Sequence, residues 1–176
     1  HVLGSAQIAI EKHGARIVAS GDYKRERDPT CRPFELVPCD IFITEATFGL
    51  PVFCHPPAAT EIGRLLTSMR QFPERTHIVG AYALGKAQRL IALAREAGYA
   101  EPIYLHGALT RLCDYYRSRG TGLGPLEPAT ADSAPPPGAL VIAPPSAVDD
   151  RWSRRFADPL ASFASGWMRI RQRAKQ

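Results

Sequence analysis

Short apolar runs divide the first fifty residues into candidate strands. The runs at residues 6–11 and 15–20 are separated by Lys12, His13 and Gly14, a spacing that predicts a β-hairpin. A polar, proline-containing loop follows to about residue 38, and residues 39–46 form another compact apolar run. This part of the chain is therefore expected to be β-rich.

The pattern changes at residue 56. Residues 56–72 read as a helix, with proline in the first turn and Ile62, Leu65, Leu66 and Met69 on one face. Strands predicted at residues 77–83 and 103–107 alternate with helices predicted at 85–98 and 108–120. Such alternation is typical of βαβ units and a parallel sheet, so the sequence predicts an α/β fold.

The last third of the chain contains fewer clear elements. Residues 121–138 are rich in proline and glycine and predict a surface loop or spacer. Beyond them, we expect a strand at residues 139–145, a short helix at 149–156 and a strand-like run at 160–167. Trp167, at the end of that run, is expected in the core.

Length and composition limit the classes of protein. The 176 residues, 45% of them hydrophobic, suit one domain, or one domain and part of a second. No apolar stretch is long enough to span a membrane, so no membrane partner is expected. The start at His1, without methionine, suggests a fragment or a processed product. Four widely spaced cysteines, with no secretory signal, suggest reduced thiols and a cytoplasmic location.

The net charge of +5 favours polyanionic partners without proving that the chain binds nucleic acid. The basic residues are grouped, and for each group a solvated surface is the simpler alternative. The groups are Lys24, Arg25 and Arg27; Arg151, Arg154 and Arg155; and Arg169, Arg171, Arg173 and Lys175.

One glycine-rich segment resembles a phosphate-binding loop. Residues 80–87, GAYALGKA, nearly match GxxxxGK[ST], but Ala87 replaces the hydroxyl residue and Gly80 lies inside a predicted strand. An NTPase is therefore a distant alternative. Lys86 still opens a helix directly after a strand, a position that suits a backbone phosphate, although a solvated lysine is an equal alternative.

Acids follow two successive predicted strands: Asp22 after residues 15–20 and Glu45 within 39–46. A turn residue is the simpler interpretation of Asp22. His1, close to the first strand, completes a His/carboxylate set of the kind that zinc or manganese hydrolases use. His106 stands alone at a strand end and is expected to be a hydrogen-bonded structural residue.

Several segments, in this order, resemble the metallo-β-lactamase-fold nucleases of the β-CASP group, in particular the bacterial ligase-associated DNA exonucleases. They are HVLGSAQI, SGDYKRERDPTC, TEATFGLP, YALGKAQRL and FASGWMRIR. The resemblance covers essentially the whole chain. It implies part of a metallo-β-lactamase αββα sandwich (residues 1–55), an inserted β-CASP α/β cap with a mainly parallel sheet (56–163), and a return to the sandwich (164–176).

The resemblance also implies roles for individual residues. His1 would ligate a metal, Asp22 would bridge two divalent ions (zinc, with manganese as the alternative), and Glu45 would orient a catalytic-site histidine. Lys86 would lie on the nucleic-acid face of the cap. Lys24 and Arg25, from the basic group after Asp22, are also expected to contact nucleic acid. The family's HxHxDH motif and later histidine are not in this sequence. The chain is therefore expected to be a middle piece that is inactive alone and binds metal poorly.

The function implied is metal-dependent exonucleolytic hydrolysis of DNA in repair. The expected partners are single-stranded or end-containing DNA, an ATP-dependent DNA ligase and a helicase. Two alternatives remain open: an RNA-processing nuclease of the same group, and a nucleic-acid-binding module without catalysis.

Overall fold

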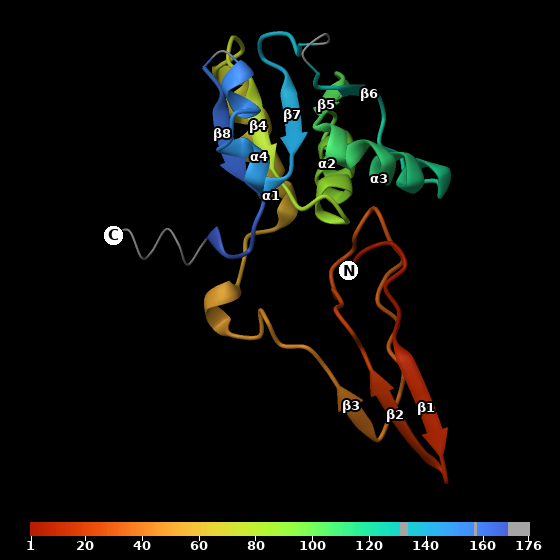
Figure 1. Cartoon of the computed structure of the whole chain (residues 1–176). Helices are drawn as coiled ribbons and strands as arrows, with labels where there is room; N and C mark the ends of the chain where they lie inside the picture. Colours follow the sequence, from red (N-terminus) through yellow and green to blue (C-terminus); the bar gives the residue numbers. More distant parts are fainter. Residues whose placement is uncertain (131–133, 157, 169–176) are drawn as a thin grey trace. The chain divides into compact units, whose positions relative to one another are not determined.

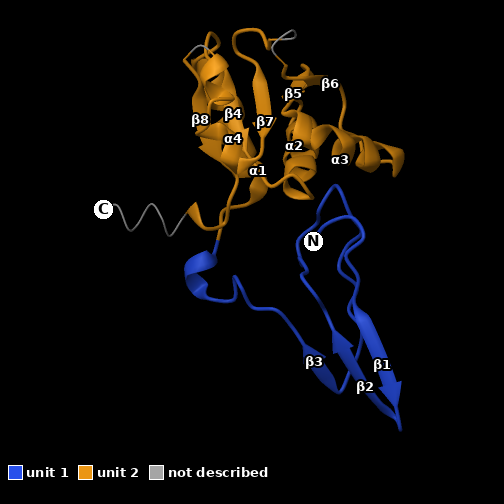
Figure 2. Cartoon of the chain, viewed as in Figure 1, with its two compact units in different colours: residues 1–54 blue, residues 55–176 orange. Residues whose placement is uncertain are grey.

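The computed structural model describes residues 1–130, 134–156 and 158–168 (Figure 1). The chain divides into two compact units, residues 1–54 and 55–176 (Figure 2). Residues 164–168 group with the second unit, and 169–176 lie outside the described residues. The assignment of 164–176 to the first domain stays a prediction.

The first unit contains the predicted hairpin. Strands β1 (Ile8–Lys12) and β2 (Ala15–Ala19) pair antiparallel, with Lys12 opposite Ala15. The two turn residues, His13 and Gly14, both have positive φ, as a tight hairpin turn that matches the strand twist requires. Strand β3 (Ile41–Ile43) then pairs parallel with β2, and the 3-10 turn η1 (Pro51–Phe53) follows.

One face of this three-stranded sheet is partly covered by aromatic side chains, whereas the other face is largely exposed. Val18 is fully buried, and on the same face Phe42 meets the ring of Tyr23, which stacks on Phe34 at 4.5 Å. Side chains alternate between faces along a strand, so the opposite face carries an apolar set. This isoleucine face consists of Ile8, Ile10, Ile17, Ile41 and Ile43. Four of its members, Ile8, Ile10, Ile41 and Ile43, are more than half exposed.

The second unit is built on a five-stranded sheet in the order β6-β5-β7-β4-β8, and all its pairs are parallel. The strands are β4 (His77–Gly80), β5 (Ile103–Leu105), β6 (Leu126–Pro128), β7 (Leu140–Ala143) and β8 (Leu160–Phe163). Every residue of β4 and β7 is buried, as expected for central strands covered on both faces. The predicted α/β fold with a parallel sheet is therefore confirmed.

Three helices lie on one face of this sheet: α1 (Ala58–Gln71), α2 (Lys86–Glu96) and α3 (Gly107–Ser118). Helix α1 packs against α2, and α2 against α3. The His77 ring, on this face of β4, is bonded to Ser68 of α1. The apolar stripes bury Ile62 and Met69 from α1, Ile91 from α2, and Leu109 and Tyr116 from α3.

The other face is covered by the short helix α4 (Pro145–Val148) and the 3-10 turn η2 (Ser153–Arg155). Ile78 and Val141 are register partners on this face, and they pack with Val148 and Phe156. Tyr104, Trp152 and Phe163 close the edges of this core.

Two expectations were wrong. Residues 121–138 contain strand β6, which was not predicted because the surrounding glycine and proline residues are typical of a loop. Strand β6 can include Pro128 because it lies at the edge of the sheet. Trp167 is 44% exposed rather than in the core, because it follows β8 and lies beyond the sheet.

Within the described residues, no helix is long and apolar enough to cross a membrane. All four cysteines are free thiols.

Candidate functional site

The two predicted acids of the first unit, Asp22 and Glu45, lie at the end of the sheet where the parallel strands β2 and β3 finish. Asp22 lies shortly after β2, which ends at Ala19, and Glu45 lies shortly after β3, which ends at Ile43 and runs parallel to β2. Their neighbours meet: the Thr44 hydroxyl lies 3.4 Å from the Tyr23 hydroxyl. Carboxyl ends of parallel strands are where ligands bind in open α/β sheets, so the position suits a site.

The structure brings His1 and Asp22 together. Nδ1 of His1 lies 3.4 Å from Oδ2 of Asp22, and the two side chains are 45% and 66% exposed. An imidazole nitrogen beside a carboxylate oxygen is a donor combination that zinc and manganese accept. The pair therefore fits part of a divalent-metal site.

Glu45 is held in a different way. Its Oε2 accepts the backbone N–H of Thr47 at 2.8 Å, which fixes the carboxylate within its own turn. Among the described residues, no group of three or more His, Cys, Asp or Glu side chains is arranged to hold a metal. His1 and Asp22 are thus two donors of a site that needs at least three.

The basic stretch after Asp22 is partly structural. Lys24 lies 3.4 Å from the carboxylate of Asp28, which is buried and also accepts the N–H and hydroxyl of Thr30 at 2.9 and 2.6 Å. This network holds Lys24 against the loop. Arg25, by contrast, is exposed.

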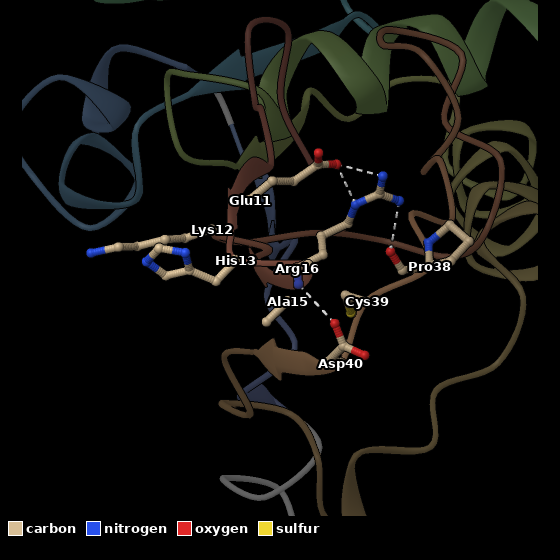
Figure 3. Close-up of a pocket in the computed structure, with 9 residues that line it drawn as sticks. Glu11, Lys12, His13, Ala15, Arg16, Pro38, Cys39 and Asp40 are labelled. Carbon is tan, nitrogen blue, oxygen red and sulfur yellow. Dashed lines mark hydrogen bonds and ion pairs between the residues drawn. The ribbon is translucent and has the colours of Figure 1, made fainter.

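A pocket of about 510 Å³ lies at the opposite end of the same sheet (Figure 3). Its polar groups pair with one another: Arg16 donates to Glu11 at 2.6 Å through Nε and to the Pro38 carbonyl at 3.1 Å. The N–H of Arg16 donates to Asp40 at 2.7 Å. These bonds tie the hairpin to the start of β3, so we interpret the pocket as structural.

In the second unit, the carboxyl ends of β4 and β7 form a topological switch point. The two strands are neighbours, yet β4 leads to α2 on one face, and β7 leads to α4 on the other. Chain connections that leave in opposite directions open a crevice at such a point, where α/β proteins bind ligands. The segment that leaves β4 there is residues 81–85.

Lys86 follows this segment as the first residue of α2, and its Nζ lies 5.4 Å from the centroid of the Tyr82 ring. Tyr82 is 58% exposed and Leu84 52% exposed. Sequence reasoning singled out Lys86 but missed Tyr82. The sequence feature that could have indicated Tyr82 is the aromatic residue within GAYALGKA, a position that the phosphate-binding motif leaves unspecified.

Two histidines are structural. His106 Nδ1 accepts the N–H of Ala108 at 3.1 Å and so caps α3, which confirms the structural role expected of it. Burial, helped by the positive charge of Arg155, lowers the pKa of His106. His77 is buried between the carbonyl of Arg75 and the hydroxyl of Ser68, each at 3.0 Å, and burial lowers its pKa as well.

Of the other two basic groups, only the one at residues 151–155 lies within the described part of the chain. In the group at residues 151–155, the Arg155 guanidinium lies 5.2 Å from the centroid of the Trp152 ring and donates to the Trp152 carbonyl at 2.9 Å. Arg169, Arg171, Arg173 and Lys175 lie outside the described residues.

Comparison with known proteins gives three informative similarities, while no protein-family model matches the chain. A protein of Opitutus terrae named "Probable DNA ligase" is 28% identical over 171 residues, 95% of this chain and 16% of that protein. Cleavage and polyadenylation specificity factor subunit 3 of Dictyostelium discoideum is 34% identical over 123 residues, 64% of this chain and 16% of that protein. Endoribonuclease ysh1 of Aspergillus fumigatus is 33% identical over 124 residues, 64% of this chain and 14% of that protein.

The chain is therefore similar to one segment of the probable DNA ligase and to one segment of each of the other two relatives. The chain spans about one sixth of the length of these relatives, at most 16%. The all-parallel sheet of the second unit is consistent with the β-CASP region that the resemblance implies.

Proposed function

We propose that this chain is part of a metal-dependent DNA exonuclease that hydrolyses phosphodiester bonds in DNA repair, in association with a DNA ligase. The observation that carries this proposal is the extent of the similarity to the probable DNA ligase. That match covers 95% of the chain, whereas the matches to the two RNA-processing relatives cover 64%.

Each site residue has a role in this proposal. His1 and Asp22 would hold part of a divalent-metal site, with zinc as the expected ion; when bound, such an ion activates water and offsets the charge that develops at phosphorus. Glu45 would be a positioning residue, because its carboxylate is already fixed by Thr47. Lys86 would bind a backbone phosphate at the switch point of the second sheet. Arg25, exposed next to Lys24, would add a weaker contact.

An RNA-processing nuclease is the second candidate, since one relative is named an endoribonuclease and another a polyadenylation factor. The chemistry would be the same, so only the substrate separates the two. A nucleic-acid-binding module without catalysis is the third candidate, and the incomplete set of metal donors among the described residues favours it for this chain by itself.

The test is an end-label release assay on the 176-residue chain and on the longest reading frame that contains it. Labelled single-stranded DNA and the same strand as RNA are compared with and without chelator. Asp22→Ala is the test variant. Asp114→Ala is its matched control, because the side chains of Asp22 and Asp114 are 66% and 64% exposed.

We expect the longer protein to release label from DNA, chelator to stop the reaction, and Asp22→Ala to abolish it while Asp114→Ala does not. Equal or faster cleavage of RNA would assign the protein to RNA processing. Strands that are retarded on a gel but never cleaved would leave only the binding function.

A further inference from the structure

Two large apolar side chains are exposed on the segment that leaves β4 at the switch point. Tyr82 and Leu84 expose 58% and 52% of their surface. A single exposed apolar residue needs no explanation, whereas exposed apolar residues that lie close together are a feature of interaction sites.

The segment is fixed by a buried glutamine. Gln88 is fully buried; its Oε1 accepts the N–H of Gly85 at 2.8 Å, and its Nε2 donates to the carbonyl of Ala83 at 2.9 Å. The carbonyl of Tyr82 in turn accepts the N–H of Ala87 at 3.1 Å. The backbone of the segment is thus bonded to α2 at Tyr82, Ala83 and Gly85, so little conformational entropy is lost when a ligand binds there.

Lys86 supplies positive charge beside the ring. Its Nζ is 5.4 Å from the centroid of the Tyr82 ring, so an aromatic surface and a cation occupy one small area. A nucleotide carries a flat base and an anionic phosphate joined through one sugar. Bases stack on aromatic side chains and phosphates pair with lysine, so the two groups together match one unpaired nucleotide.

We propose that Tyr82 is a base-stacking residue, and that the substrate meets the switch point as an unpaired strand whose base lies on Tyr82 and whose phosphate lies at Lys86. Bases within a duplex are stacked on one another and present no free face to the ring. This inference rests on the nucleic-acid substrate of the proposed function and narrows it to single-stranded segments.

The experiment measures binding of a fluorescent oligothymidine, the corresponding blunt duplex and an abasic strand of the same length, all in chelator, to the 176-residue chain. The variants are Tyr82→Ala, Tyr82→Phe and Lys86→Ala. Tyr115→Ala is the matched control: Tyr115 is 48% exposed and has Arg119 at 5.2 Å from its ring centroid, but it lies within α3. Circular dichroism checks that each variant is folded.

We expect Tyr82→Ala to weaken oligothymidine binding about 5- to 150-fold, the loss of one stacked base, and Tyr82→Phe to change it less than about twofold. Binding of the duplex and of the abasic strand should be the same in Tyr82→Ala as in the original chain. Lys86→Ala should lower the salt dependence of binding by about 0.7, one phosphate, and Tyr82→Ala should leave it unchanged.

Equal weakening of oligothymidine and abasic strand by Tyr82→Ala would show a structural role and overturn the stacking inference. No effect, or the same effect as Tyr115→Ala, would overturn it as well. In these cases the unsubstituted chain still binds nucleic acid, so the proposed function stands. A chain that binds none of the three ligands would also overturn the stacking inference, whereas the proposed function is overturned only if the longer protein fails to release label from DNA in the assay above.

Discussion

Gly80 is the last residue of β4, and a side chain there would collide with the core. A Cβ added to Gly80 would lie 2.6 Å from Cδ1 of Phe163 and 3.0 Å from Cγ2 of Val148. Space, rather than phosphate binding, therefore explains the first glycine of the loop-like motif. At the scale of the residue, this agrees with the predicted location of Gly80 inside a strand.

We expect Gly80→Ala to lower the free energy of unfolding by about 1–3 kcal/mol, the cost of overpacking a filled core. Gly63→Ala is the control substitution at a glycine with free space: Gly63 lies within α1 and nothing lies within 4 Å of an added Cβ. Because alanine has a higher helix propensity than glycine, this substitution should stabilise the chain by about 0.5–1 kcal/mol. Urea unfolding measures both. The packing explanation is wrong if Gly80→Ala is neutral, or if it destabilises the chain and adding Phe163→Leu recovers none of the lost stability.

Arg95 shows how a charged side chain can join elements instead of binding a ligand. Its Nε donates to the carbonyl of Leu123 at 3.0 Å, its Nη1 to those of Tyr99 and Glu101 at 2.7 Å, and its Nη2 to that of Pro125 at 2.6 Å. Burial lowers the pKa of Arg95, yet the four carbonyls satisfy its charge. The residue connects the end of α2 to the segments that precede β5 and β6.

We expect Arg95→Leu to cost about 2–4 kcal/mol of unfolding free energy, because several carbonyls lose their donor at once. Arg111→Leu, at an exposed position of α3, should change it by less than about 0.5 kcal/mol. The two variants are compared by chemical denaturation. Nucleic-acid binding should be the same in both, since neither arginine belongs to the proposed interface; a selective loss of binding in Arg95→Leu at unchanged stability would refute this assignment.

The isoleucine face of the first unit has an expected consequence in solution. Contiguous exposed apolar surface binds hydrophobic dyes, whereas a single exposed residue does so weakly. We expect Ile10→Thr combined with Ile43→Thr to lower dye fluorescence severalfold, and Leu36→Thr to leave it unchanged although Leu36 is 85% exposed. Equal fluorescence in all three proteins would mean that the face is not accessible as a patch.

Elements with a strong pattern were predictable, and those fixed by tertiary contacts were not. The helix at residues 58–71 and the buried strands at 77–80 and 140–143 follow from apolar spacing alone. Strand β6 could not be predicted, because its residues become a strand only by pairing with β5. In the site, the residue types suggested His1 and Asp22 as one set, whereas the exposure of Tyr82 depends on how its segment leaves β4, which no local pattern encodes.

At the scale of the molecule, protonation couples to folding through two histidines of the second unit. Nδ1 of His77 donates to the carbonyl of Arg75 and its Nε2 lies 3.0 Å from the hydroxyl of Ser68, while Nδ1 of His106 accepts the N–H of Ala108. The pKa values of both rings are lowered from the usual 6.5, chiefly by burial. Below about pH 6.5 the unfolded chain therefore binds more protons than the folded one, and stability must fall as the pH falls.

We expect the unfolding free energy of the second unit to decrease as the pH is lowered from 7.5 to 5.5 and to level off only below the lowered pKa values. Urea titrations followed by tryptophan fluorescence report on this unit, because both tryptophans, Trp152 and Trp167, lie in it. His77→Gln combined with His106→Asn, which keeps an acceptor at the cap of α3, should flatten the pH profile. His13→Asn, in the exposed hairpin turn of the first unit, should leave the profile as it is. A profile that stays equally steep in the double variant would show that other groups, and not these two rings, link the fold to pH.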